Sequence, residues 1–210
     1  MKKIAFSTRY GLEQAVIASL KGMTRREDKK LNHPLVTSIS EWGIDDKGKA
    51  YVTITYSTGL TEDVYPAYQI GETVAIAQAY NTLRWPSVPG IDWNAIVDEV
   101  THAKGWKNKM FVKAKYMPHR IRITDIRVER LQDITDEDSM REGIEEEGFR
   151  GEYRWGFYTG FFTTNRGQGC KSVWFNSPRK AFADLIDRIS GRGTWERNPW
   201  VFVYKFEITK

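Results

Sequence analysis

The segment 120–130 constrains the fold of this chain more than any other part of the sequence. Charged and apolar side chains alternate over Arg120-Ile121-Arg122-Ile123, which is typical of a strand with one wet face and one buried face. The apolar positions then change phase, because Ile126 and Val128 follow the dipeptide Thr124-Asp125, and a β-bulge at that dipeptide accounts for the shift. A long, half-exposed strand of this kind predicts a mostly antiparallel sheet.

The rest of the pattern mixes helices with short strands. Helical spacing and start signals predict helices at 10–21, 92–103, 135–142 and from Ser177-Pro178 to Gly191. Segments of β-forming residues between turn residues predict strands at 36–43, 50–57, 73–80, 110–116, 120–130 and 200–208. Gly22 is predicted to end the first helix in the left-handed conformation, and Thr135 to cap the start of the third. We therefore expect a mixed α+β fold with a mostly antiparallel, barrel-like sheet and flanking helices.

The length and apolar content suit one sizeable domain. The chain has 210 residues, 40% of them hydrophobic, so a single domain over 1–210 can bury a core. Cys170 is the only cysteine, so no disulfide forms within the chain, and a reducing compartment, the cytoplasm, is expected. No apolar run approaches the roughly 18 residues that cross a bilayer, and the start lacks the apolar stretch of a secretory signal. We expect no membrane association.

Charge is unevenly distributed along the chain. The net charge is +5, yet 104–130 is strongly basic and 133–147 is strongly acidic. The basic stretch suits contact with nucleic acid, with Trp106, Phe111 and Tyr116 available to stack on bases. The alternative is a half-exposed strand that keeps its charges in water, and both interpretations stay open at this point.

Standard catalytic motifs are mostly missing. His33, His102 and His119 are far apart, with no carboxylate or cysteine pattern beside them, so no metal site is expected. No glycine-rich phosphate loop precedes a helix, so nucleoside triphosphate hydrolysis is not expected either. No cofactor is predicted.

Three stretches resemble the ASCH family, PUA-like domains of the type found in bacteria, phages and mobile elements. The first is Phe6-Ser7-Thr8 followed by Lys21-Gly22-Met23-Thr24-Arg25-Arg26, which is similar to the family's opening signature of a Lys and a Thr before a basic residue. The second and most specific runs from Met117-Pro118-His119 to Glu142-Gly143-Ile144. The third begins at Pro178-Arg179-Lys180-Ala181-Phe182 and continues through the last strand. The family usually has Gly-Arg before the Lys and Thr after it, where this chain has Ser19-Leu20 and Gly22.

The resemblance implies a fold and a set of functional residues. The fold is a PUA-like β-barrel, enlarged here by insertions at about 30–65 and 145–175. In the relatives that hydrolyse acetylcytidine, a Lys, a Thr and a Glu at these motif positions form the catalytic set. In this sequence those positions are Lys21, Thr24 and Glu142.

Three functions are compatible with these features. The first is binding of RNA or a modified nucleoside in a positively charged cleft between the Lys21–Arg26 turn and the Glu142 helix, with basic contacts from Arg25, Arg26, Arg120 and Arg122. The second is an amidohydrolase acting on an acylated nucleobase such as acetylcytidine, in which a lysine of lowered pKa activates a threonine hydroxyl. The third is a protein-interaction module of a mobile element that uses the polarised charge.

The proposed catalytic residues also have a structural interpretation. Lys21 lies near a predicted helix C-terminus, where the helix dipole favours a cation, Thr24 can cap a turn, and Glu142 is then a solvated residue of a last turn. The catalytic hypothesis instead requires the three side chains to converge within hydrogen-bonding reach. It also expects Glu142→Gln to remove activity while leaving folding nearly unchanged.

Overall fold

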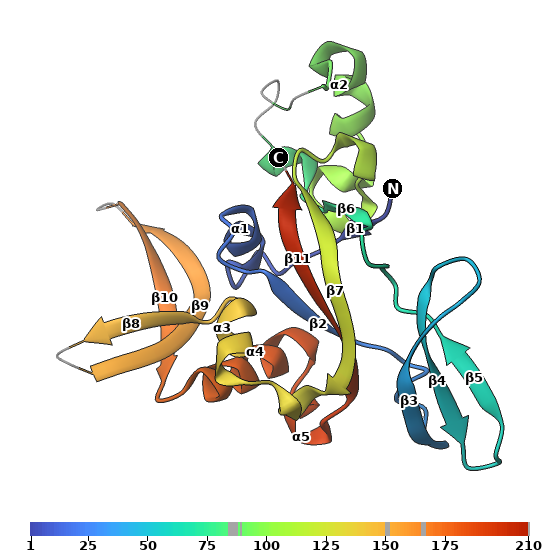
Figure 1. The fold of residues 1–210 in the computed structure, drawn as a ribbon. Helices are drawn as coiled ribbons and strands as arrows, with labels where there is room; N and C mark the ends of the chain where they lie inside the picture. Colours follow the sequence, from blue (N-terminus) through green and yellow to red (C-terminus); the bar gives the residue numbers. More distant parts are fainter. Residues whose placement is uncertain (84–87, 89, 150–151, 165–166, 210) are drawn as a thin grey trace.

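A five-stranded sheet lies at the centre of the computed structural model, which describes residues 1–83, 88, 90–149, 152–164 and 167–209 (Figure 1). Its strands, in spatial order, are β1 (Lys3–Ile4), β6 (Thr73–Ile76), β7 (Arg120–Arg130), β11 (Trp200–Thr209) and β2 (Met23–Glu27). β1 and β6 are parallel, and the other neighbours are antiparallel. Over the described residues the sheet does not close into a barrel, because β1 and β2 remain its two edges. The fold is mixed α+β, and most of its regular structure is in strands.

The long strand carries the predicted bulge. Asp125 lies opposite Lys205 of β11, and Ile123 lies opposite the next residue, Phe206, so Thr124 is the extra residue. The phase change read from the sequence is therefore confirmed. The last strand differs from its predicted alternation, because residues 201–204 are all buried. Both faces of β11 are covered at that point, as expected for a strand inside a sheet that packs on two sides.

Two smaller antiparallel sheets flank the central one (Figure 1). One consists of β3 (Val36–Ile44), β4 (Ala50–Tyr56) and β5 (Thr61–Val64), which confirms the hairpin predicted over 36–57. The other consists of β8 (Glu145–Phe149), β9 (Glu152–Thr164) and β10 (Gly167–Phe175). These sheets are built from the residues expected as insertions.

The helices follow local capping chemistry where the sequence carries it. The hydroxyl of Thr135 accepts from the Asp138 backbone N–H and starts α3 (Asp136–Arg141). The hydroxyl of Ser177 does the same for α4 (Pro178–Ser190), with Pro178 in the first turn. α2 (Trp93–Thr101) lies within its predicted range, and a short α5 (Thr194–Arg197) precedes β11.

The structure corrects three sequence predictions: the extent of the first helix, its glycine cap and the strand at 110–116. α1 spans only Leu12–Ile17, and Ser19 rather than Gly22 adopts positive φ after it (φ 61°). The chain therefore turns earlier than the glycine indicated. The segment 110–116 forms two 3-10 turns (Lys109–Phe111 and Ala114–Tyr116) instead of a strand, and the side chain of Asn108 accepts from the Met110 N–H to start the first.

Buried side chains form two clusters. The larger joins the central sheet to α4 and to both small sheets, with Ile123, Phe202, Leu185, Ile54 and Phe157 among its members. The smaller gathers around α2 and the 3-10 turns at Ala75, Ala77, Tyr80, Val100, Val112, Tyr116 and Met117. None of the helices in the described ranges is long and apolar enough to span a membrane.

Candidate functional site

A cleft of about 580 Å³ lies along the open edge of β2. Residues that follow β1, including Phe6 and Ser7, form one wall, and α4 forms the other with Phe182 and Leu185. The cleft thus occupies the place where the two edges of the central sheet fail to meet. Its full lining is Ala5, Phe6, Ser7, Arg9, Tyr10, Leu12, Lys21, Thr24, Arg25, Arg26, Glu27, Glu142, Phe182, Leu185, Ile186, Arg188, Ile189 and Ser190.

Lys21 and Glu142 form a buried ion pair in this cleft. The Lys21 ammonium donates to Oε2 of Glu142 at 2.6 Å and to the Glu142 backbone carbonyl at 2.6 Å. Their side chains are 1% and 5% exposed, so the interpretation of Glu142 as a solvated residue is wrong. Glu142 is the C-cap of α3, and its carboxylate turns inward from the end of that helix.

Burial gives Lys21 unusual acid–base properties. Removal of the ammonium from water lowers the pKa of Lys21 below its usual 10.5, and the nearby cations Arg25 and Arg26 lower it further. The Glu142 carboxylate opposes these effects by favouring the charged form of the lysine. A lysine with a lowered pKa is unprotonated more often than a surface lysine, so it is more often available to act as a general base.

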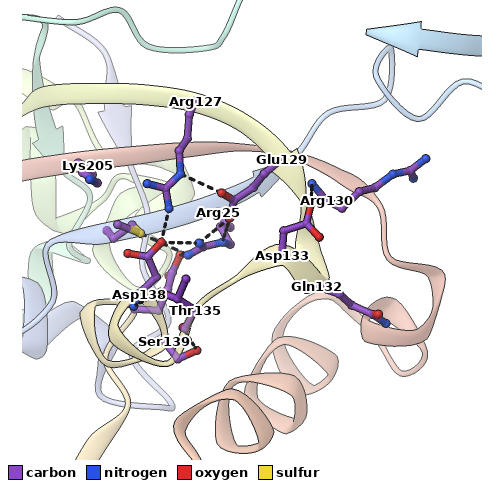
Figure 2. Close-up of polar contacts among 12 residues, drawn as sticks. Arg25, Arg127, Glu129, Arg130, Gln132, Asp133, Thr135, Asp138, Ser139 and Lys205 are labelled. Carbon is purple, nitrogen blue, oxygen red and sulfur yellow. Dashed lines mark hydrogen bonds and ion pairs between the residues drawn. The ribbon is translucent and has the colours of Figure 1, made fainter. Parts of the chain in front are cut away.

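Arg25 extends this pair into a larger network, and Figure 2 shows its contacts with Glu129 and Asp138. Its Nη1 donates to the other oxygen of Glu142 at 3.1 Å, and its Nε and Nη2 donate to Oε1 of Glu129 at 2.9 and 2.6 Å. Nη2 also donates to Asp138 at 3.1 Å. Arg127 bonds the same two carboxylates, Glu129 at 2.8 Å and Asp138, from the outer side. Arg25 is therefore fixed by three carboxylates from β7 and α3.

The charges of this network cancel. The cations Lys21, Arg25 and Arg127 face the carboxylates of Glu129, Asp138 and Glu142. A buried arginine whose guanidinium is already paired in this way cannot offer its charge to a ligand phosphate without leaving carboxylates unpaired. Arg25 thus holds Glu142 in place, and its predicted role as a nucleic-acid contact is not supported by its position.

Thr24 shares the cleft but not the ion pair. Its side chain is buried, and among the described residues no hydrogen bond joins its hydroxyl to Lys21 or Glu142. Neighbouring residues of a strand point to opposite faces, so Thr24 and Arg25 leave β2 on different sides. The structure therefore brings together two of the three predicted catalytic residues and places the third nearby, along the same open edge.

The remaining predicted basic contacts divide into two groups. Arg26 lines the cleft, where its guanidinium lies over the Phe6 ring and donates to the Ala5 carbonyl at 2.7 Å. Arg120 and Arg122 are exposed on β7 beside β6 and do not line the cleft. The expectation that Arg120 shares one cleft with Lys21 is wrong, because the strand carries it to the far end of the sheet.

Sequence reasoning missed several residues of the cleft. Arg9 is exposed at its mouth, with its guanidinium over the Tyr10 ring at 5.5 Å. Phe182 and Arg188 enter from α4. Arg9 directly follows Phe6-Ser7-Thr8 in the chain, so the motif read from the sequence stopped one residue short of it. Its position in the cleft depends on how the two edge strands, β1 and β2, are placed across the opening between them, which no local pattern encodes.

Within the described ranges, no three His, Cys, Asp or Glu side chains are arranged to hold a metal ion. Comparison of the chain with protein-family models, with curated proteins and with solved structures finds no match in any of the three. The resemblance to ASCH proteins therefore stays a prediction from sequence motifs.

Proposed function

We propose that the cleft beside β2 binds a nucleotide presented by single-stranded RNA, including one with a modified base. The observation that carries this proposal is the pair Arg9 and Arg26. Both line the cleft, and neither has a carboxylate partner within the described part of the chain. Two unpaired guanidinium groups in one cleft favour an anionic ligand such as a phosphate.

Aromatic and backbone groups of the cleft suit a nucleobase. Phe6, Tyr10 and Phe182 line the cleft, and because these side chains are buried in the core they give a base an apolar wall to pack against. In the part of the chain that the structure describes, β2 pairs with β11 alone, so alternate N–H and C=O groups on its other side are available to bond the edge of a base. A cleft of about 580 Å³ lies within the usual range for small-molecule sites.

The same cleft supports the proposal that the central sheet is a PUA-like barrel left open between β1 and β2. Residues just after β1 and residues of β2 form opposite sides of the opening, and Arg26 spans it by its bond to the Ala5 carbonyl. The ligand site would then lie at the seam of the barrel.

Fluorescence anisotropy with labelled single-stranded RNA at several salt concentrations tests the binding function. Arg9→Gln removes an exposed cation without touching the buried network, so it should weaken binding about ten-fold, or about 1.4 kcal/mol. It should also lower the salt dependence by roughly one phosphate contact. The control is the double variant Arg120→Gln/Arg122→Gln, which removes more charge from outside the cleft. Binding that is insensitive to Arg9→Gln and lost in the control would assign RNA contact to β7 instead.

A second candidate, amide hydrolysis on an acylated base, is favoured by the Lys21–Glu142 pair and by the lowered pKa of Lys21. The Thr24 hydroxyl would lose its proton to an unprotonated Lys21 and attack the acyl carbon. The C–N bond would break as Lys21 returns that proton to the leaving amine, and water would then cleave the threonine ester to release the acid and restore the hydroxyl. Thr24→Val keeps the shape of the side chain and removes only the hydroxyl. It should abolish acetate release from acetylcytidine while RNA binding persists; unchanged acetate release would exclude Thr24 as the nucleophile.

A further inference from the structure

The acidic side chains of the stretch 133–147 divide into a buried group and an exposed group. Asp138 and Glu142 belong to the buried network, and Glu137 pairs with Arg141 along α3 at 2.7 Å. Glu145 and Glu146, at the start of β8, have no cationic partner within the described ranges. These two carboxylates are the part of the acidic stretch that neither the fold nor the cleft uses.

Glu145 and Glu146 border an apolar groove on another part of the surface from the cleft. The groove holds about 520 Å³ and lies between the end of α1 and the junction of α3 with β8. Its lining includes Leu20, which is 67% exposed, and Met140, which is 37% exposed. Large apolar side chains that stay this exposed around a groove commonly mark an interaction site.

We propose that this groove docks a partner protein through a segment in which apolar residues are flanked by lysine or arginine. The apolar side chains of that segment would cover Leu20 and Met140, and its cations would face Glu145 and Glu146. The same carboxylates repel RNA phosphates and anionic lipid, so those ligands do not suit the groove. This function is separate from nucleotide binding and does not depend on it.

The groove and the cleft lie on either side of the same two backbone turns. Leu20 in the groove precedes Lys21 in the cleft, and Arg141 precedes Glu142. The two turns are joined by a bond from the Gly22 N–H to the Arg141 carbonyl at 3.1 Å. A docked partner would therefore lie directly behind the buried ion pair.

The test titrates the ¹⁵N-labelled full chain with a synthetic helical peptide of leucine and lysine, and separately with the same peptide carrying glutamate in place of lysine. We expect saturable shifts of the Leu20, Met140 and Gly143 amide signals with the lysine peptide only. Leu20→Ser should weaken its binding at least five-fold, since it removes apolar contact area at an already exposed position. Glu145→Gln/Glu146→Gln should weaken it about three- to ten-fold.

Two controls separate this proposal from the others. Asp46→Asn/Glu196→Gln removes the same charge away from the groove and should leave peptide affinity unchanged, as should Arg9→Gln in the cleft. Equal binding of both peptides, or shifts centred outside the groove, would overturn the proposal. So would concentration-dependent self-association in sedimentation that Leu20→Ser abolishes, because the occupant would then be a second copy of the chain.

Discussion

The Lys21 ammonium lies 2.6 Å from the carboxylate of Glu142, although 121 positions separate the two residues. This contact joins the start of β2 to the end of α3, and Arg25 and its carboxylates surround it. The pair is buried, so it has consequences for both stability and proton affinity. Both can be measured before any ligand is known.

Glu142→Gln is expected to destabilise the protein by about 3–5 kcal/mol, because it leaves Lys21 and Arg25 buried with a neutral partner. This cost replaces the prediction from the sequence that Glu142→Gln would leave folding nearly unchanged. Urea denaturation followed by circular dichroism measures the change. Glu137→Gln on the same helix is the control. Its side chain is 70% exposed and, among the described residues, pairs with Arg141 alone, so the change should cost less than about 0.5 kcal/mol. Equal costs for the two variants would contradict the buried network.

The pKa of Lys21 should lie below 10.5, since burial penalises its charged form. A ¹³C titration of the lysine side chains measures it directly. Glu142→Gln should lower the pKa of Lys21 further, because the Glu142 carboxylate is the main group that raises it. The comparison uses the pH range in which the variant stays folded. A midpoint above 10.5 in the unmodified protein would show that the ion pair outweighs desolvation.

Gly143→Ala should destabilise the protein by more than its backbone strain alone. Gly143 has φ +99°, and a Cβ there would lie 2.9 Å from Leu12 Cδ2 and 3.5 Å from Lys21 Cδ. Gly48→Ala provides the matched control, because its φ is +73° with nothing within 4 Å of the added Cβ. We expect Gly48→Ala to cost about 1 kcal/mol and Gly143→Ala at least about 1 kcal/mol more in thermal denaturation. Identical costs would mean that the side chains of Leu12 and Lys21 move away from the added Cβ without loss of stability.

Stability should fall as the pH rises above about 10. Burial raises the pKa of Tyr204, whose hydroxyl accepts from the Ala67 N–H at 3.0 Å. In the unfolded chain this phenol ionises near pH 10, so above that pH the folded state binds more protons and loses stability. Melting temperatures between pH 8 and 11 check this. Tyr204→Phe should flatten the decline; an equally steep decline in that variant would assign the effect to other groups.

Local chemistry explains which parts of the fold were predictable. The bulge at Thr124 and the caps at Thr135 and Ser177 follow from residues within a few positions of each other, and the structure confirms them. The predicted cap at Gly22 was wrong, because the chain turns earlier, at Ser19, which adopts the left-handed conformation. The predicted strand at 110–116 was wrong, because the Asn108 side chain starts a turn where β-forming residues suggested a strand.

The site was less predictable, because its contacts span long distances in the sequence. Arg25 meets Glu129 and Asp138 at separations of 104 and 113 residues, so no local pattern shows that its charge is already paired. Lys21 and Glu142 were associated only through resemblance to a family. Arg9 was missed because only the placement of the two sheet edges on opposite sides of the opening brings it to the cleft.

The most direct measurement of the central claim is photo-crosslinking with single-stranded RNA that carries 4-thiouridine, followed by mass spectrometry of the linked peptides. Nucleotide binding at the edge of β2 predicts links within 5–10 and 21–27, and their loss in Arg9→Gln. Links confined to the basic segment 104–122, unchanged by Arg9→Gln, would contradict the account.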